Sequence, residues 1–124
     1  MSVHITAIFT AVLALLQIYC TLQVAGRRRA QRISLGDQGD KELQRRIRAH
    51  GNFTETVPMA LLILLINEIQ GLPETWLYAL GIALVVGRIS HFIALTRKVS
   101  LQFRVFGMSI TLLVMLIGAI LLVI

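Results

Sequence analysis

The chain is organised around the stretch Arg48-Ala49-His50-Gly51-Asn52-Phe53-Thr54-Glu55-Thr56-Val57-Pro58, which opens the apolar run 59–66. Charged and amide side chains at the mouth of a membrane span are unfavourable unless they face protein or water, so they indicate a functional site. Arg48, Asn52 and Glu55 are spaced i, i+4 and i+7, within an arc of roughly 60° on one face of a helix. Pro58 removes one backbone hydrogen bond and predicts a kink. The stretch therefore predicts a membrane helix with one polar face.

The composition is typical of a membrane protein. The 124 residues are 56% hydrophobic and 15% charged, and the mean hydropathy is +0.79. The twelve Lys and Arg residues lie only at 27–48, at 88 and at 97–104. Basic loops on the cytoplasmic side explain this distribution, so the net charge of +6 does not indicate nucleic-acid binding.

We expect a single all-α domain, an integral membrane four-helix bundle covering residues 1–124. Its spans are predicted at about 4–25, 49–70, 74–95 and 105–124, since roughly 20 residues of helix cross a hydrocarbon core of about 30 Å. No basic segment precedes the first span, which predicts a retained helix rather than a signal peptide. The second helix is expected to begin near Lys41, with Asp40 as its N-cap, and a basic loop is expected at 96–103. The positive-inside rule places both termini outside the cytoplasm.

Two classes of chemistry are disfavoured by the residue inventory. Cys20 is the only cysteine, so no internal disulfide is expected. The three histidines, His4, His50 and His91, are isolated in sequence, and no metal site is predicted.

Polar residues from all four predicted helices reach the same depth. They are Arg28 and Arg29 at the end of the first helix, Arg48, Asn52 and Glu55 on the second, Arg88 and His91 on the third, and Arg104 at the start of the fourth. This convergence predicts a cationic cavity in the cytoplasmic third of the bilayer, with Glu55 as its one buried acid. Guanidinium groups match carboxylates in shape, so a small anion with several acceptors is the expected ligand.

Each of these residues also has a structural interpretation. The arginines at 27–32, 45 and 46 can determine topology through anionic headgroups. Glu55 can be the ion-pair partner of Arg48 or Arg88. His91 ends a stripe of small residues (Ala79, Ala83 and Gly87) that permits close helix approach, and it can be a packing residue. Agreement in depth among separate groups favours the functional interpretation.

The pattern Arg48-Ala-x-x-Asn52-x-x-Glu55-x-x-Pro58 resembles the signature of the membrane-associated proteins in eicosanoid and glutathione metabolism, the MAPEG family. Arg88-x-x-His91, Arg104 and the Arg28-Arg29 pair resemble further positions of that family. The resemblance extends over essentially the whole chain in helix number, loop lengths and motif positions.

This resemblance implies a homotrimer that binds glutathione between neighbouring subunits near the cytoplasmic face. Its implied glutathione ligands are Arg29, Arg48, Asn52, Glu55, Arg88 and His91. Arg104 is the implied catalytic residue beside the sulfur, where a cation favours the thiolate. The implied activity is that of a transferase or peroxidase of the bacterial inner membrane, acting on a small hydrophobic electrophile from the lipid bilayer.

One position departs from the family pattern. Many eukaryotic members carry a tyrosine four residues after the position of His91, where this chain has Leu95. A catalytically silent member that binds lipid or glutathione is therefore an alternative. A small four-span exporter is a more remote alternative, because its first span would need an acid and the surrounding arginines repel cationic cargo.

Overall fold

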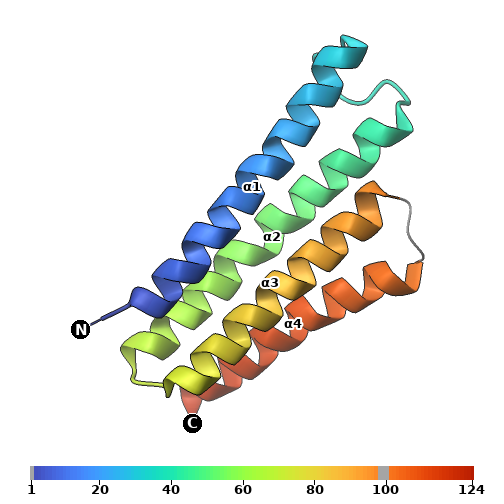
Figure 1. The fold of residues 1–124 in the computed structure, drawn as a ribbon. Helices are drawn as coiled ribbons and strands as arrows, with labels where there is room; N and C mark the ends of the chain where they lie inside the picture. Colours follow the sequence, from blue (N-terminus) through green and yellow to red (C-terminus); the bar gives the residue numbers. More distant parts are fainter. Residues whose placement is uncertain (1, 98–100) are drawn as a thin grey trace.

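The structure is a computed structural model that describes residues 2–97 and 101–124. It contains four helices in antiparallel sequence, α1 (His4–Gln31), α2 (Lys41–Ile69), α3 (Glu74–Thr96) and α4 (Leu101–Val123) (Figure 1). All four are long and apolar enough to cross a membrane. The predicted all-α fold with four membrane-crossing helices is therefore confirmed.

One helix extends beyond its predicted membrane span, and another begins earlier than predicted. α1 continues to Gln31, past the predicted end of its span, and closes on Arg32, whose φ of 57° is left-handed. α4 begins at Leu101, so the prediction that residues 101–103 belong to a loop is wrong. Hydropathy reports where lipid begins, whereas a helix continues beyond lipid wherever its residues tolerate helical backbone. At the other end of the predicted loop, Thr96 is the last residue of α3 and Arg97 is its C-cap. Residues 98–100 of that loop lie outside the described residues.

The start of α2 is anchored to the end of α1. Asp40 is the N-cap that the sequence predicted, and its carboxylate accepts a hydrogen bond from Leu43 N at 3.3 Å. The guanidinium of Arg27, on α1, lies 2.8 Å from Asp40 and 2.9 Å from Glu42. These ion pairs fix the two helices at the end of the bundle that carries the 32–40 loop.

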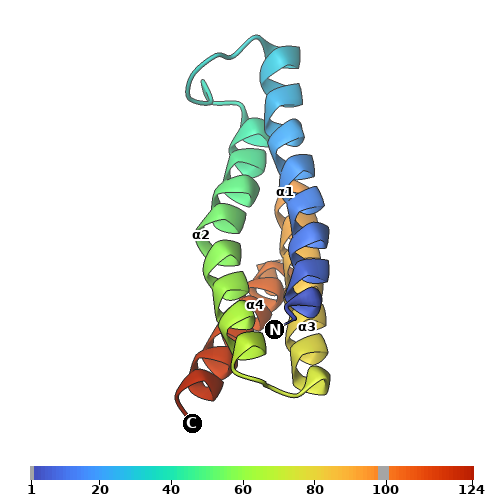
Figure 2. The same ribbon diagram turned by 90° about the vertical axis from the view of Figure 1, so that its left-hand side faces the viewer.

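The hydrophobic core lies mainly among α1, α2 and α3. Its buried apolar side chains include Ile5, Phe9, Leu13, Phe53, Val57, Leu64, Leu77, Leu80, Leu84 and Val114. α4 is tilted relative to the other helices (Figure 2) and packs on α3 and α2, while the described residues of α1 and α4 make no contact. The tilt of α4 leaves room for a cavity between the Leu101 end of α4 and α2.

The opposite end of the bundle is closed by two polar contacts. Glu68 accepts hydrogen bonds from the first backbone amides of α1, Ile5 N at 3.0 Å and Thr6 N at 2.8 Å. The buried Asn67 donates to Gly118 O on α4 at 3.1 Å. Both chain termini lie toward this end, opposite the 32–40 loop (Figure 1).

Candidate functional site

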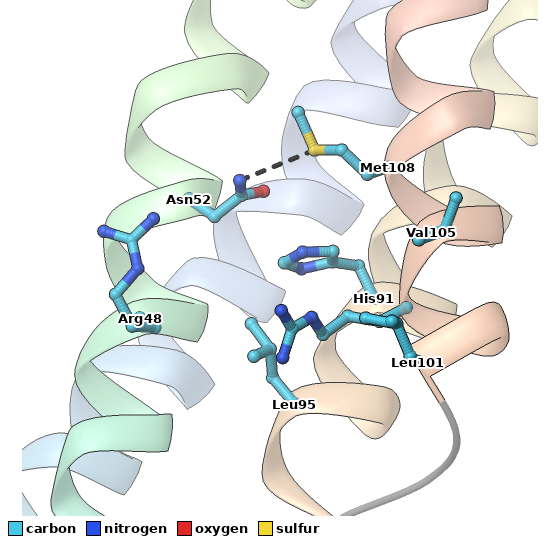
Figure 3. A pocket seen from close by; sticks show the side chains of 8 residues that line it. Arg48, Asn52, His91, Leu95, Leu101, Val105 and Met108 are labelled. Atoms are coloured by element: carbon cyan, nitrogen blue, oxygen red, sulfur yellow. Dashed lines mark hydrogen bonds between the residues drawn. The ribbon is translucent and has the colours of Figure 1, made fainter.

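A cavity of about 340 Å³ opens between α2, α3 and α4. Its lining consists of Arg48 and Asn52 from α2, His91 and Leu95 from α3, and Leu101, Arg104, Val105 and Met108 from α4 (Figure 3). Four of the residues predicted from sequence, Arg48, Asn52, His91 and Arg104, are therefore brought together. The polar lining residues come from all three helices, and the apolar side chains come mostly from α4.

The α2 wall presents one guanidinium and one amide. Arg48 and Asn52 are one turn apart, as their spacing predicted, and both line the cavity. Asn52 Nδ2 donates to Met108 Sδ at 3.5 Å. Because a thioether is a weak acceptor, this contact leaves the amide free to exchange partners with a ligand oxygen.

The expectation that Glu55 is buried does not hold within the single chain, where Glu55 is exposed and does not line the cavity. Its carboxylate lies 3.8 Å from Arg48 Nη1, and the two side chains are 60% and 61% exposed. Arg48, Asn52 and Glu55 share one face of α2, but Asn52 and Glu55 lie at opposite edges of that arc. The Asn52 edge lines the cavity and the Glu55 edge is exposed. Of the two ion-pair partners considered for it, Arg48 is the one observed, at the exposed surface.

Arg88 does not line the cavity but lies behind its wall. It is 2% exposed, and its guanidinium is 5.9 Å from the centre of the Phe53 ring. Arg88 Nη2 donates to Asn52 Oδ1, and Arg88 Nη1 lies 3.3 Å from Thr111 Oγ1. Arg88 Nη2 also lies 3.4 Å from Nδ1 of the His91 ring. Arg88 therefore contacts the two neutral polar residues of the cavity from inside the bundle.

Arg28 and Arg29 are separate from this cavity in the single chain. They line a second cavity of about 500 Å³ at the end of α1, together with Ala25, Arg32, Ile33 and Ser34. Arg28 Nη1 also donates to Gly36 O at 2.7 Å, which holds the 32–40 loop against α1. The structure therefore does not bring Arg29 to the residues of the first cavity within one protomer.

Several lining residues were not singled out from the sequence. Leu101, Val105 and Met108 are spaced i, i+4 and i+7 and share a face with Arg104, at i+3. The position of Arg104 on an otherwise uncharged helix was the available signal for that face. The residues that the structure describes contain no group of three His, Cys, Asp or Glu side chains able to hold a metal.

Comparison with known proteins places the chain in a family. A sequence model of the MAPEG family matches residues 6–124. This chain belongs to the MAPEG family. It is also 35% identical over 108 residues to the inner membrane protein YecN of Escherichia coli strain K12, a match that covers 86% of this chain and 81% of the relative. YecN of Escherichia coli O6:H1 strain CFT073 matches to the same extent. The resemblance noted from the polar face of α2 is thereby confirmed, and MAPEG is a glutathione-associated family that includes glutathione transferases.

Proposed function

We propose that this MAPEG protein is a membrane-bound glutathione transferase or peroxidase that holds glutathione as its thiolate. The observation that carries the proposal is the cavity itself, in which Arg48, Asn52, His91 and Arg104 meet between helices that are apolar enough for a bilayer. Two guanidinium groups, an amide and an imidazole suit a ligand rich in carboxylate and carbonyl oxygens. Glutathione has such oxygens and carries its own nucleophile, so the chain needs no reactive cysteine or serine.

Arg104 is assigned to the sulfur. It stands in the first turn of α4, beside the apolar lining residues Leu101 and Val105. A cation in apolar surroundings stabilises a thiolate and lowers the pKa of the thiol, which releases its proton to water. In conjugation, the thiolate sulfur forms a bond to an electrophilic carbon, and the leaving group departs with its electron pair.

In the peroxidase reaction, the sulfur attacks the outer oxygen of a lipid hydroperoxide and the O–O bond breaks. The lipid oxygen takes a proton and becomes an alcohol, and the sulfur becomes a sulfenic acid. A second glutathione condenses with it to give glutathione disulfide and water. Both reactions use an apolar electrophile that reaches the cavity from the bilayer.

The proposed active assembly is a homotrimer in which a neighbouring protomer covers the outer face of α2. Arg48 and Glu55 are about 60% exposed on a helix that is apolar enough to cross a membrane, and such residues are unfavourable against lipid. A second protomer there buries the Arg48–Glu55 pair, places Glu55 near the ammonium of glutathione and allows its Arg29 to approach the ligand. Crosslinking in mild detergent should give trimers, and a ladder that ends at dimers would contradict the assembly.

The proposed location is the bacterial inner membrane with both termini outside the cytoplasm. The location is inferred from the relatives, which are inner membrane proteins, and the orientation is inferred from the basic loops. The cavity then opens near the cytoplasmic face, where soluble glutathione can enter.

The test is ultraviolet absorbance of the thiolate, titrated against pH with glutathione bound to the purified protein in detergent. The parent should form thiolate near neutral pH. Arg104→Ala should raise the thiol pKa and leave the affinity within about tenfold, equivalent to about 1.4 kcal/mol. Arg48→Ala should instead weaken binding by about 10- to 100-fold, the loss of a charged hydrogen bond.

Arg97→Ala is the matched control, because Arg97 is exposed at the end of α3 and does not line the cavity. An unchanged thiol pKa in Arg104→Ala would remove Arg104 from the mechanism. A second candidate function, a silent glutathione binder, is favoured by Leu95, which places an alkyl group in the cavity. A parent that binds glutathione without forming thiolate would establish that alternative.

A further inference from the structure

We infer that Arg88 is a positioning residue that turns Asn52 and His91 so that both present N–H donors to the cavity. The part of the ligand held there must then consist of acceptors, as a carboxylate or a peptide carbonyl does. The consequence for glutathione rests on the proposed function, whereas the orientation of the two side chains does not.

Arg88 is a buried side chain that can only donate hydrogen bonds. Arg88 is 2% exposed, and none of the described residues offers it a carboxylate within ion-pair distance. A guanidinium has five N–H donors and no acceptor. One of them, Nε, is buried without a partner. Arg88 therefore has more N–H donors than its surroundings have hydrogen-bond acceptors. A polar side chain beside it is favoured when its acceptor atom faces the guanidinium.

Asn52 provides a hydrogen-bond acceptor for Arg88 with its side-chain carbonyl oxygen. Arg88 Nη2 donates to Asn52 Oδ1, which fixes which end of the amide faces the bundle interior. The NH₂ group then lies on the other side, where Nδ2 contacts Met108 Sδ at 3.5 Å. Met108 is itself a lining residue, and Figure 3 shows the Asn52 amide directed toward it. A ligand oxygen is a better acceptor than a thioether and replaces it readily.

His91 also provides a hydrogen-bond acceptor for Arg88, with one nitrogen of its ring. Its Nδ1 lies 3.4 Å from Arg88 Nη2, and since Arg88 cannot accept, Nδ1 must provide the lone pair. The neutral ring therefore carries its proton on Nε2. Nε2 has no hydrogen-bond partner among the described residues, and the ring forms part of the cavity lining (Figure 3). His91 thus presents Nε2–H as a donor.

The result is a cavity with a single polarity. Arg48 and Arg104 can only donate hydrogen bonds. Because Arg88 occupies the acceptor atoms of Asn52 and His91, these two residues also present donors to the cavity. An ammonium group placed among four donors finds no acceptor and meets like charge, so the amino end of a ligand is directed elsewhere. The carboxylate of Glu55, which lies outside the cavity beside Arg48, is a nearby acceptor for that ammonium group. Arg88 therefore contributes to the orientation of the ligand without touching it.

The first experiment reads the tautomer of His91 directly and requires no ligand. Protein labelled with ¹⁵N-histidine in detergent is examined by long-range ¹H–¹⁵N correlation, and the His91 signals are assigned from their loss in His91→Asn. The parent should show the Nε2–H form, and Arg88→Gln should lose this preference because a glutamine can accept as well as donate. Arg97→Gln, on the same helix, should leave it unchanged. A parent in the Nδ1–H form would overturn the inference.

The second experiment separates positioning from a structural role. Asn52→Asp gives Arg88 a carboxylate and removes the amide donor from the cavity. The midpoint of thermal unfolding should therefore hold or rise, while glutathione affinity falls at least tenfold. A merely structural contact predicts that stability and affinity change together, and unchanged affinity would contradict the inference.

The two proposals fail in different ways. If the parent binds no glutathione but His91 is in the Nε2–H form, the proposed function is wrong and the positioning role stands. If Arg88→Gln does not fold, the tautomer of the parent and the Asn52→Asp measurement still decide.

Discussion

Gly87 of α3 and Gly107 of α4 pack with their backbones in contact. A Cβ atom on Gly107 would lie 2.7 Å from Gly87 O and 2.7 Å from His91 N, and a Cβ on Gly87 would lie 3.1 Å from Gly107 O. Small residues between membrane helices allow the two helix backbones to approach this closely. Because His91 and Arg104 lie one turn from these glycines on either helix, the contact sets the width of the cavity.

Gly107→Ala should therefore destabilise the protein by about 1–3 kcal/mol, the usual effect of overpacking. Gly87→Ala should have a smaller effect, because its contacts begin at 3.0 Å and the first is with the Ile110 side chain. Thermal unfolding in detergent is the measurement. Gly26→Ala is the control, since nothing lies within 4 Å of its Cβ position. Equal midpoints for Gly107→Ala and Gly26→Ala would show that α3 and α4 are less closely packed.

Asn67→Leu should lower the stability by about 1 kcal/mol, in the range measured for hydrogen bonds between membrane helices. Asn67 is 1% exposed and donates to Gly118 O at 3.1 Å, so leucine removes this hydrogen bond between α2 and α4. Gln70→Leu, at the exposed end of α2, controls for added hydrophobicity. The test is the unfolding midpoint, and a more stable Asn67→Leu would indicate that packing outweighs this hydrogen bond.

Stability should depend on Asp40 in the acid range. The hydrogen bond from the Arg27 guanidinium holds the pKa of the Asp40 carboxyl below its usual value. Because the pKa is lower in the folded state, the carboxylate stabilises the fold above its unfolded pKa of about 3.9, and this contribution is lost as pH falls through the folded pKa. Asp40→Asn should be less stable than the parent at pH 7 and should show a weaker acid dependence.

Unfolding midpoints measured from pH 7 down to acid pH test this dependence. Glu74→Gln is the control, since Glu74 makes no ion pair in the described part of the chain. Parallel pH profiles for Asp40→Asn and the parent would show that the Arg27–Asp40 pair does not couple to folding.

Leu95→Tyr should strengthen thiolate formation. Leu95 lines the cavity, so a tyrosine there adds a hydroxyl donor where the chain has an alkyl group. One hydrogen bond of about 0.5–1.5 kcal/mol corresponds to roughly a 2- to 10-fold gain in affinity or thiolate fraction. Leu95→Phe supplies the ring without the hydroxyl. If both variants behave alike, the hydroxyl has no role in this cavity.

A reporter that works only outside the cytoplasm should be active when it is fused after Ile124. A reporter that works only in the cytoplasm should be active when it is inserted at Gly36. Both termini lie toward one end of the bundle and the 32–40 loop lies at the other (Figure 1), so either reporter must give opposite results at the two positions. Arg32 in that loop and the basic residues of the flanking helix ends determine which end of the bundle is cytoplasmic. A cytoplasmic C-terminus would reverse the orientation without altering the fold.

The number of helices and most of their bounds could be predicted from the sequence. Hydropathy, helix length and the Asp40 cap are local properties, and they act over a few turns whatever the neighbouring helices do. The spacing of Arg48 and Asn52 likewise placed them on one face. The first turn of α4 was missed at Leu101, because the end of a helix does not coincide with the boundary of lipid.

Which of the polar groups face the cavity depends on the tertiary structure. In the single chain, Arg88 lies buried behind the cavity wall and Glu55 lies at the exposed surface. The direction of a side chain depends on the rotation of its helix against its neighbours, and here that rotation is set by contacts distant in sequence, such as Gly87 with Gly107. The polarity of Asn52 and His91 was decided in the same way, because it depends on a guanidinium that reaches Asn52 from another helix.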